Sequence, residues 1–373
     1  MSSYCIGLLS GTSMDAIDAL LADCSGPVPQ LIATHRQAIE PDLKTRLVEI
    51  VNSGPASRLG EVWSVHQQLG DSFAKAAGIL LQTSGIDSGQ VRVIGLHGQT
   101  VLHQPRARPP YTLQLGNPGI VAEQTGIPVV ADFRSMDIAA GGEGAPLAPL
   151  LHRALFRSDE EDRLVINLGG IANVTCLARD RDVTGWDTGP ANCLLDAWIQ
   201  RHRQQAFDKN GDWAASGQPD QELLSQLLAD PWLATAPPKS TGTDYFNLDW
   251  LIGHIGSNTH RPRDIQATLA QFTARSLRES VNRDAGFNPD RILLCGGGVH
   301  NQDLVQRIQD QFETIPVQTT AAQGLDPDWV EGLLFAWLGW QRLNQRILDS
   351  RAITGARRPL MLGTITNPGS AVV

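Results

Sequence analysis

A repeated pattern limits how this chain can fold more than any other feature. From Tyr4 onwards the sequence predicts a strand, a glycine turn, two more strands and a helix, and the same order begins again at Asp162. The two copies start about 160 residues apart, which indicates duplicated domains, because the repeats of solenoid proteins are roughly 20 to 50 residues long. We therefore expect an α/β fold with two similar domains.

The repeat also suggests where the domains begin and end. We place the first domain at residues 1–140 and the second at 141–344, and we expect a tail of about 345–373 to return to the first domain. Pro, Gly and Trp are frequent between about 205 and 262, so this segment is predicted to be an insertion with little regular structure. The expected strands cover residues 4–10, 16–24, 30–39, 91–98, 111–115, 127–131, 163–170, 171–180, 181–189 and 291–295.

The composition argues against nucleic-acid and membrane partners. The net charge is −9 and Lys and Arg form no run, whereas a phosphate-binding surface needs clustered basic residues. The apolar stretch from Gly332 to Trp340 is about half of the roughly 20 residues that a bilayer span needs. Asp15 and Asp18 interrupt the apolar N-terminal run, so no secretion signal is expected. The five cysteines are widely spaced and are expected to be free thiols of a cytoplasmic protein.

Three glycine-rich turns carry the strongest chemical signal. They span Leu9 to Asp18, Asn167 to Thr175 and Cys295 to Asn301, and each follows an apolar strand. Glycine lets backbone N–H groups approach an anion closely, so such turns can bind phosphate without a lysine. One such turn is more often structural, but three in a duplicated chain favour a nucleotide site. None matches the common P-loop or dinucleotide patterns.

Two further residues leave alternatives open. Asp187 comes directly before a Thr-Gly-Pro turn and a helix predicted from about Pro190, so it is either a general base near a helix N-terminus or only a helix cap. Arg134 can clamp a carboxylate or phosphate through its fork of donors, or it can pair with Asp132 as part of the structure.

Eight segments, in this order, resemble the anhydro-N-acetylmuramic acid kinase family. They are GLLSGTSMDAID, GLHGQTVLH, ADFRSMDIAAGGEGAPLAP, INLGGIANVT, WDTGPANCLLDAW, KSTGTDYFNLDWL, CGGGVHN and TGARRPLMLG. Together they span almost the whole chain. The resemblance implies a member of the hexokinase, heat-shock chaperone and actin superfamily, with two RNase H-like (actin-like ATPase) domains and an ATP cleft between them.

The resemblance also implies a reaction. Water attacks the anomeric carbon of 1,6-anhydro-N-acetylmuramic acid while the γ-phosphoryl group of ATP moves to the released O6, which gives N-acetylmuramic acid 6-phosphate for peptidoglycan recycling. ATP and Mg²⁺ are the implied cofactors, and a homodimer is the implied assembly. The alternatives are an actin-like kinase that acts on an ordinary sugar hydroxyl, and an ATP-switched binding protein.

Roles for individual residues follow from the matching segments. Asp187 would be the catalytic base, Asp15 and Asp18 would contact Mg²⁺ through water, and Arg134 would bind the lactyl carboxylate. The residues that would bind ATP are Gly11, Thr12, Ser13, Met14, Asp15, Ala16, Ile17, Asp18, Gly169, Gly170, Asn173, Gly296, Gly297, Gly298 and Asn301. Those that would bind the sugar are Gln99, Thr100, Arg134 and Glu331.

Four positions depart from the family pattern. Ala16 and Ala191 replace glycines, and each adds a methyl group where backbone approaches a ligand or a helix. Trp186 replaces Phe, and Glu143 replaces Gln. The proposed base and the other hairpin glycines remain, so we expect activity.

Overall fold

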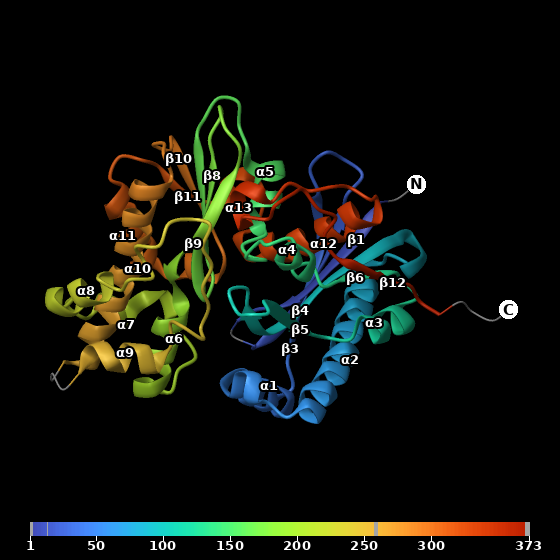
Figure 1. Cartoon of the computed structure of the whole chain (residues 1–373), viewed down its shortest axis with the longest axis horizontal. Coiled ribbons are helices and arrows are strands. Elements are labelled where there is room, and N and C mark those ends of the chain that lie inside the picture. Colours follow the sequence, from blue (N-terminus) through green and yellow to red (C-terminus); the bar gives the residue numbers. More distant parts are fainter. Residues whose placement is uncertain (1–2, 13, 257–259, 370–373) are drawn as a thin grey trace. The chain divides into compact units, whose positions relative to one another are not determined.

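The computed structural model describes residues 3–12, 14–256 and 260–369. Residues 1–155 and 331–373 form one compact unit, and residues 156–330 form a second. Each unit contains its own sheet with helices packed against it, and Figure 1 labels these elements. The α/β fold class expected from the sequence is confirmed.

The first unit is built on a seven-stranded sheet of order β12-β6-β4-β1-β2-β3, with β5 paired to β4. β1 is antiparallel to β2 and β2 to β3, whereas β1, β4 and β6 run parallel. The strands are β1 (Tyr4–Ser10), β2 (Ala16–Asp23), β3 (Gln30–Ala38), β4 (Val91–Gln104), β5 (Tyr111–Leu115), β6 (Val129–Ala131) and β12 (Thr364–Thr366). The helices are α1 (Pro41–Ser53), α2 (Leu59–Ser84), α3 (Pro118–Thr125), α4 (Ser135–Ala139), α5 (Ala148–Phe156), α12 (Val330–Leu343) and α13 (Arg351–Thr354).

The second unit repeats this arrangement in a five-stranded sheet of order β11-β10-β7-β8-β9. β7, β8 and β9 are antiparallel neighbours, and β7, β10 and β11 run parallel. The strands are β7 (Arg163–Leu168), β8 (Ile171–Leu177), β9 (Thr184–Pro190), β10 (Arg291–Cys295) and β11 (Val317–Thr319). The helices are α6 (Asn192–Arg203), α7 (Asp212–Ala215), α8 (Gln221–Leu228), α9 (Leu248–Ile255), α10 (Pro262–Asp284) and α11 (Gln302–Phe312).

The five strands of the second sheet therefore match five strands of the first, β6-β4-β1-β2-β3, and β5 and β12 are additional. In each, the first strand pairs on one side with a hairpin partner and on the other with a parallel strand that comes much later in the sequence. This is the RNase H-like order, and its occurrence twice in one chain is the duplication that the repeat predicted.

The division into units differs from the sequence-based one. Residues 141–155 and 331–344 belong to the first unit rather than the second. The cause is a close contact between α12 and the first sheet, because a Cβ added at Gly7 would overlap the backbone of Gly332 and Ala336. A Cβ at Gly95 would likewise overlap the Phe335 carbonyl. Glycine at both positions lets the helix lie directly on the strands.

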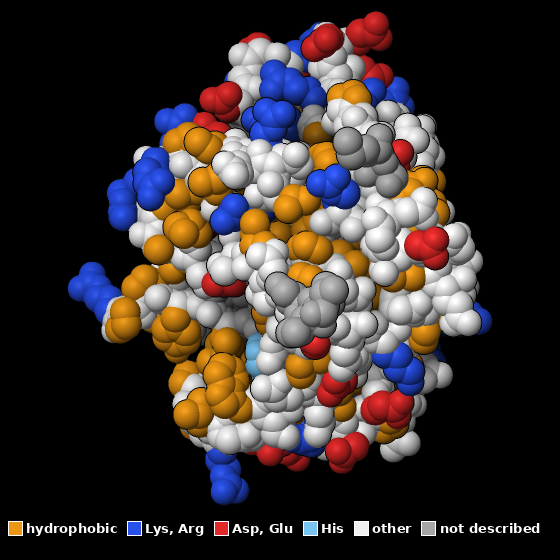
Figure 2. All heavy atoms as spheres, turned by 90° about the vertical axis from the view of Figure 1, so that its right-hand side faces the viewer, with side chains coloured by type: hydrophobic (Ala, Val, Ile, Leu, Met, Phe, Trp, Pro, Cys, Tyr) orange, Lys and Arg blue, Asp and Glu red, His pale blue; other side chains and the backbone are white. Residues whose placement is uncertain are grey.

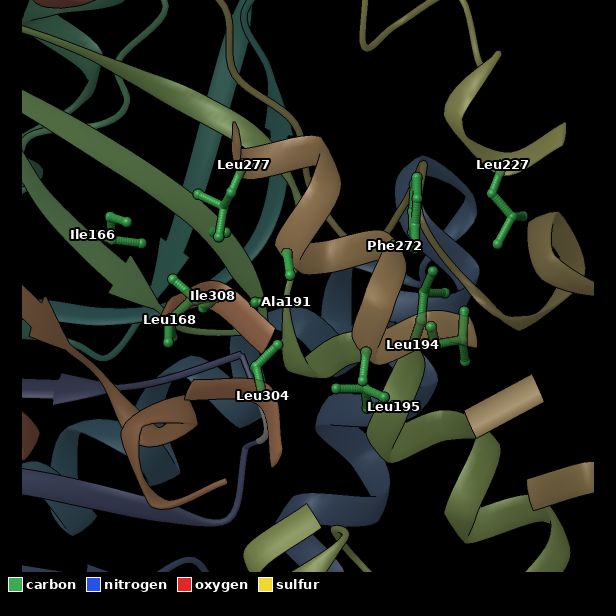
Figure 3. Packing of buried hydrophobic residues seen from close by; sticks show 14 of the residues in the cluster. Ile166, Leu168, Ala191, Leu194, Leu195, Leu227, Phe272, Leu277, Leu304 and Ile308 are labelled. Carbon is green, nitrogen blue, oxygen red and sulfur yellow. The ribbon is translucent and has the colours of Figure 1, made fainter. Parts of the chain in front are cut away.

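The segment 205–262 is more regular than expected. It contains α7, α8 and α9, and its apolar side chains join the buried core of the second unit. Figure 3 shows Leu227 of this segment within the same cluster as Leu194, Leu195 and Phe272. The pattern was missed because these helices are only four to eight residues long, which is too short for a clear helical period.

Two smaller expectations are settled by the structure. All five cysteines are free thiols, as predicted, and four of them are buried. Among the helices of the described residues, none has the length and apolar character that crossing a bilayer requires.

Candidate active site

The first glycine turn joins β1 to β2 and is closed by a hydrogen bond from Met14 N to Gly11 O (3.0 Å). A Cβ at Gly11 would meet no described atom within 4 Å, so the protein packing does not itself require glycine there. Thr12 is exposed, whereas Ser13 lies outside the described residues. Ile17 is fully buried in the core, so its side chain cannot contact a nucleotide and only its backbone remains available.

The two acidic residues of this hairpin already face basic partners. Asp15 pairs with Lys44, and Asp18 pairs with Arg36 at 2.6 Å. Asp15, Lys44 and Arg36 keep 41 to 53% of their side-chain surface exposed, whereas Asp18 keeps 21%. Such pairs are screened by water and are readily exchanged for another cation. The carboxylates predicted to face Mg²⁺ are thus close to each other in sequence and accessible.

The four residues predicted to bind sugar all belong to the first unit. Gln99 and Thr100 lie in β4, Arg134 precedes α4, and Glu331 lies in the first turn of α12. Gln99 is 3% exposed, and its Oε1 has no hydrogen-bond partner among the described residues. A buried polar atom without a partner is costly unless something else satisfies it. This orphaned acceptor therefore indicates a position that faces a ligand or an ordered water.

Arg134 is held by two neighbours. Its Nη1 donates to Gly144 O (2.8 Å), and its Nε and Nη2 lie 3.3 and 3.0 Å from His97 Nε2. Burial, together with the positive charge of Arg134, holds the pKa of His97 well below its usual range. A neutral His97 whose Nδ1 donates to Gly98 O (3.0 Å) leaves Nε2 as an acceptor for the guanidinium. Asp132 instead accepts a hydrogen bond from Ser135 N (3.2 Å).

Glu331 has an unusual electrostatic environment. It keeps solvent access, yet desolvation by surrounding protein atoms and the negative charge of Asp18 raise the pKa of its carboxyl, while Arg134 opposes the shift. A carboxyl with a raised pKa can hold a proton closer to neutral pH. Arg134, Asp18 and Glu331, which come from distant parts of the sequence, therefore influence one another in the first unit.

The second glycine turn is fixed more rigidly. Gly169 O accepts from Asn192 N (3.1 Å) and from Asn192 Nδ2 (2.7 Å), and Gly170 O accepts from Ala191 N (2.9 Å). These bonds attach the β7–β8 turn to the beginning of α6. Asn173 follows in β8, and its Oδ1 is buried without a partner among the described residues.

Asp187 lies within β9, directly opposite Asn173 of β8. Residues that pair in this way project from the same face of a sheet with Cβ atoms about 5 Å apart. Asp187 is 6% exposed, its Oδ2 accepts from Thr241 N (2.9 Å), and its N–H donates to Lys239 O (3.2 Å). The carboxylate is therefore held by the loop 239–241.

The alternative of a helix cap is wrong. The residue at the N-cap of α6 is Ala191, and Pro190 ends β9 instead of forming the first turn of the helix. The strand extends to Pro190 because Ile171 of β8 pairs with it. Asp187 therefore does not cap α6, and its carboxylate accepts a backbone N–H of the loop 239–241 instead.

The third glycine turn follows β10. Gly296 has a φ of 82°, and a Cβ at Gly298 would overlap the side chain of Leu168. A Cβ at Gly297 would meet no described atom within 4 Å. Asn301 accepts a hydrogen bond from Leu304 N (2.9 Å) and so caps α11. Gly296 and Gly298 therefore have structural reasons to be glycine, whereas Gly297 leaves its backbone open on one side.

Thr241 and Lys239 were not predicted as site residues. They lie in the segment KSTGTDYFNLDWL, which carries part of the family resemblance but whose residues were assigned no catalytic role from the sequence. The preceding pair of prolines and the short helices around it gave no sign that this loop contacts Asp187. His97 was missed for a similar reason, since an isolated histidine is more often structural.

Two sheets of the same RNase H-like order, each with a glycine turn after its first strand, define an actin-like α/β protein. Within this class the chain belongs to the anhydro-N-acetylmuramic acid kinase family, because the model of that family matches residues 3–368. The family suggested by the eight segments is thereby confirmed.

Close relatives cover nearly the same length. The anhydro-N-acetylmuramic acid kinase of Xanthomonas axonopodis pv. citri is 45% identical over 365 residues, which are 96% of this chain and 97% of that protein. The enzyme of the same name from Coxiella burnetii is 43% identical over 362 residues, 96% of each chain. Among solved structures, a ROK family glucokinase from Streptomyces griseus in complex with glucose and AMPPNP matches with a TM-score of 0.43 at 16% identity, covering 91% of this chain and all of that one.

Proposed function

We propose that this protein is an ATP-dependent anhydro-N-acetylmuramic acid kinase of peptidoglycan recycling. It opens 1,6-anhydro-N-acetylmuramic acid with water and phosphorylates O6, giving N-acetylmuramic acid 6-phosphate and ADP. The observation that carries this proposal is the match of family and relatives over nearly the whole chain. A buried carboxylate held by a backbone N–H, at Asp187, supports it.

Asp187 acts as the general base. The phosphoryl acceptor is the bridging ether oxygen, which has no proton to lose, so the proton that must be removed belongs to the attacking water. The Thr241 N–H bond favours the ionised carboxylate and fixes its direction. General-base catalysis of this kind contributes about 10² to 10⁴ in rate, and the rest comes from positioning and from neutralising phosphate charge.

Arg134 and Gln99 bind the sugar. The guanidinium of Arg134, fixed by His97 and Gly144, pairs with the lactyl carboxylate that distinguishes a muramic acid from a glucosamine. The unpartnered Oε1 of Gln99 accepts a hydrogen bond from a sugar hydroxyl or amide. Thr100 and Glu331 complete the polar surface that the sugar contacts.

The three glycine turns bind ATP. The residues from Gly11 to Asp18 and from Gly169 to Asn173 present backbone N–H groups to the phosphates, and those from Gly296 to Asn301 contact the adenosine. The open sides of Gly11 and Gly297 fit a ligand that approaches the backbone. Asp15 and Asp18 supply hard oxygen ligands that suit Mg²⁺ held through water, and the ion would neutralise charge on the phosphates.

We infer the cellular compartment and the assembly of the enzyme from the same family. We place it in the cytoplasm, where ATP and the recycled sugar meet, and we expect a homodimer. Nucleic acid is not a proposed partner. The net charge is −9, and Figure 2 shows basic and acidic side chains interspersed with apolar ones over one face.

The proposal is tested by coupled ADP release with anhydro-N-acetylmuramic acid. Wild type turns over, and Asp187→Asn, which keeps the shape but removes the base, lowers kcat at least about 10²-fold. Asp180→Asn, at an exposed residue of the same unit, serves as the matched control and keeps wild-type activity. Phosphorylation of plain N-acetylmuramic acid but not of the anhydro-sugar would contradict the proposal and favour a kinase for an ordinary hydroxyl. ATP-dependent sedimentation without sugar turnover would favour a switched binding protein.

A further inference from the structure

A buried lysine lies next to the loop that holds Asp187. The side chain of Lys239 is 1% exposed, its Nζ donates to Leu233 O (3.0 Å), and it lies 4.4 Å from the centre of the Trp232 ring. A side chain this deeply buried cannot contact a sugar or a nucleotide. Any contribution it makes to the reaction acts through its neighbours.

The backbone of the same loop contacts Asp187 at two points. Lys239 O accepts a hydrogen bond from Asp187 N (3.2 Å), and Thr241 N donates one to Asp187 Oδ2 (2.9 Å). The first bond fixes the strand, and the second fixes the carboxylate. Since the Lys239 ammonium attaches this loop to Leu233, the lysine restrains both bonds at once.

The loop has a second attachment on its other side. Asp230 is buried and accepts hydrogen bonds from Tyr245 Oη (3.0 Å) and Trp250 Nε1 (2.9 Å). Trp232 N also donates to Asp230 (2.8 Å). The residues before and after the loop are therefore fixed to each other, and Lys239 fixes the part between them.

Three charged side chains act electrostatically on Lys239. Burial and then the Arg283 guanidinium lower the pKa of Lys239 to about 8, whereas Asp284 and Asp187 raise it. Electrostatic influence is mutual, so an aspartate that favours the protonated lysine is itself favoured in its ionised form by that lysine. Lys239 therefore helps to keep Asp187 ionised, which is the form that a general base needs.

This arrangement costs stability. At neutral pH, a protonated lysine whose pKa is lowered by burial is less stable in the folded protein than in the unfolded chain. Its burial therefore lowers the free energy of unfolding. An apolar side chain of similar length would fill the same space without that penalty. A charge at this position therefore needs a reason beyond filling space, and the anchoring bond to Leu233 O together with the effect on Asp187 supplies one.

We propose that Lys239 is a positioning residue for Asp187, which anchors the loop 239–241 so that the Thr241 N–H aligns the carboxylate and whose charge keeps that carboxylate ionised. This inference rests on the proposed role of Asp187 as the general base. It gives the loop 239–241 a role in orienting Asp187, which the reaction scheme itself does not require.

The test compares Lys239→Met and Lys239→Arg with wild type in kcat and KM between pH 5 and 9. Lys209→Met, at an exposed lysine of the same unit, is the matched control. We expect Lys239→Met to lower kcat about 10-fold with KM changed less than about 3-fold, and to move the acid limb of the kcat profile to higher pH. Lys239→Arg keeps the charge and should hold the acid limb near its wild-type position. A lower kcat with an unmoved acid limb would overturn the inference, because a merely structural role predicts that result.

A second readout does not depend on turnover. The carboxyl carbon of Asp187, assigned by its loss in Asp187→Asn, is followed by NMR across the same pH range. In Lys239→Met it should titrate at higher pH than in wild type, and equal titration in both proteins would overturn the inference. If wild type shows no turnover but the shift is present, the proposed function fails and the positioning role stands.

If Lys239→Met does not fold, NMR titration of the wild-type protein alone still tests the inference. The Asp187 carboxyl signal should then show a second inflection at the pH where Lys239 itself is seen to lose its proton. Absence of that inflection, with Lys239 itself seen to titrate, would contradict the proposal.

Discussion

The two units share a strand order but attach helices to their sheets in different ways. In the first, α12 lies on the backbone of β1 and β4 at Gly7 and Gly95, and no room is left for a side chain. In the second, β7 contains no glycine, and large side chains such as Leu194 and Phe272 fill the core. The same topology thus tolerates both backbone contact and side-chain packing, and a single added methyl group has different consequences in the two units.

The glycine turns of the two units also differ, in how firmly each is fixed to the rest of its unit. The turn of the first unit is bordered by solvent-accessible ion pairs at Asp15 and Asp18, which can exchange partners when a charged ligand arrives. The carbonyls of Gly169 and Gly170 in the second are bonded to the start of α6. A charged, exchangeable turn suits binding of phosphates and a cation, whereas a fixed turn suits phosphate binding by backbone N–H groups that are already in position.

The largest expected change in stability comes from placing a side chain in the backbone contact between β1 and α12. Gly7→Val places a branched side chain against the main chain of Gly332 and Ala336, which cannot move away without displacing α12. We expect a loss of about 3 kcal/mol or more, measured by urea unfolding. The control is Gly78→Ala in α2, where a Cβ meets open space, and it should add up to about 1 kcal/mol. Equal stability of Gly7→Val and wild type would show that α12 does not depend on this contact.

The next largest effect is a loss of stability at acidic pH. Burial lowers the pKa of His152, in the first unit, to about 3, and His97 and His103 of the same unit are shifted downward as well. The unfolded chain takes up a proton near pH 6.5 and the folded one does not, so stability present above pH 6.5 is lost as the pH falls toward 3. For His152 this is about 2 kcal/mol at pH 5.

Urea unfolding of His152→Leu at pH 7.5 and pH 5 measures this contribution. The variant should lose less stability on acidification than wild type does. The prediction fails if wild type and His152→Leu lose the same free energy between the two pH values.

The smallest effect is expected at the exchangeable ion pairs. Lys44→Met removes the partner of Asp15, and because both side chains are well exposed the stability should change by less than about 1 kcal/mol. If Asp15 serves Mg²⁺, the Mg²⁺ concentration for half-maximal activity should fall, since a competing cation is gone. A large loss of stability would show that this turn is as rigid as that of the second unit, and would remove the contrast between them.

The sequence was most informative where the signal is local. Apolar runs bounded by glycine turns predicted both hairpins, from Tyr4 and from Arg163, within a few residues. The strand order was implied only by the family resemblance, because local elements do not determine which strands pair across a crossover. The family and its reaction came from eight segments that are specific only as a set.

Contacts between distant residues could not be predicted. Gly7 meets Gly332 across more than 300 residues, and nothing in either strand or helix pattern signals that α12 belongs with the first sheet. Pro190 favours the first turn of a helix, yet pairing with Ile171 keeps it in β9. Thr241 holds Asp187 through a backbone N–H, a group that every residue except proline has, so no side-chain pattern reveals it.

The interrupted first unit has a consequence for biosynthesis. The strands β1 to β6 of its sheet are made before residues 156–330, whereas α12 and β12 follow that segment. At about 5 to 20 residues per second, synthesis of residues 156–330 alone takes roughly 10 to 35 s, and the backbone of Gly7 and Gly95 stays uncovered throughout that time. The second unit, which is continuous, can complete its fold in that interval. The half of the protein that is started first is therefore finished last.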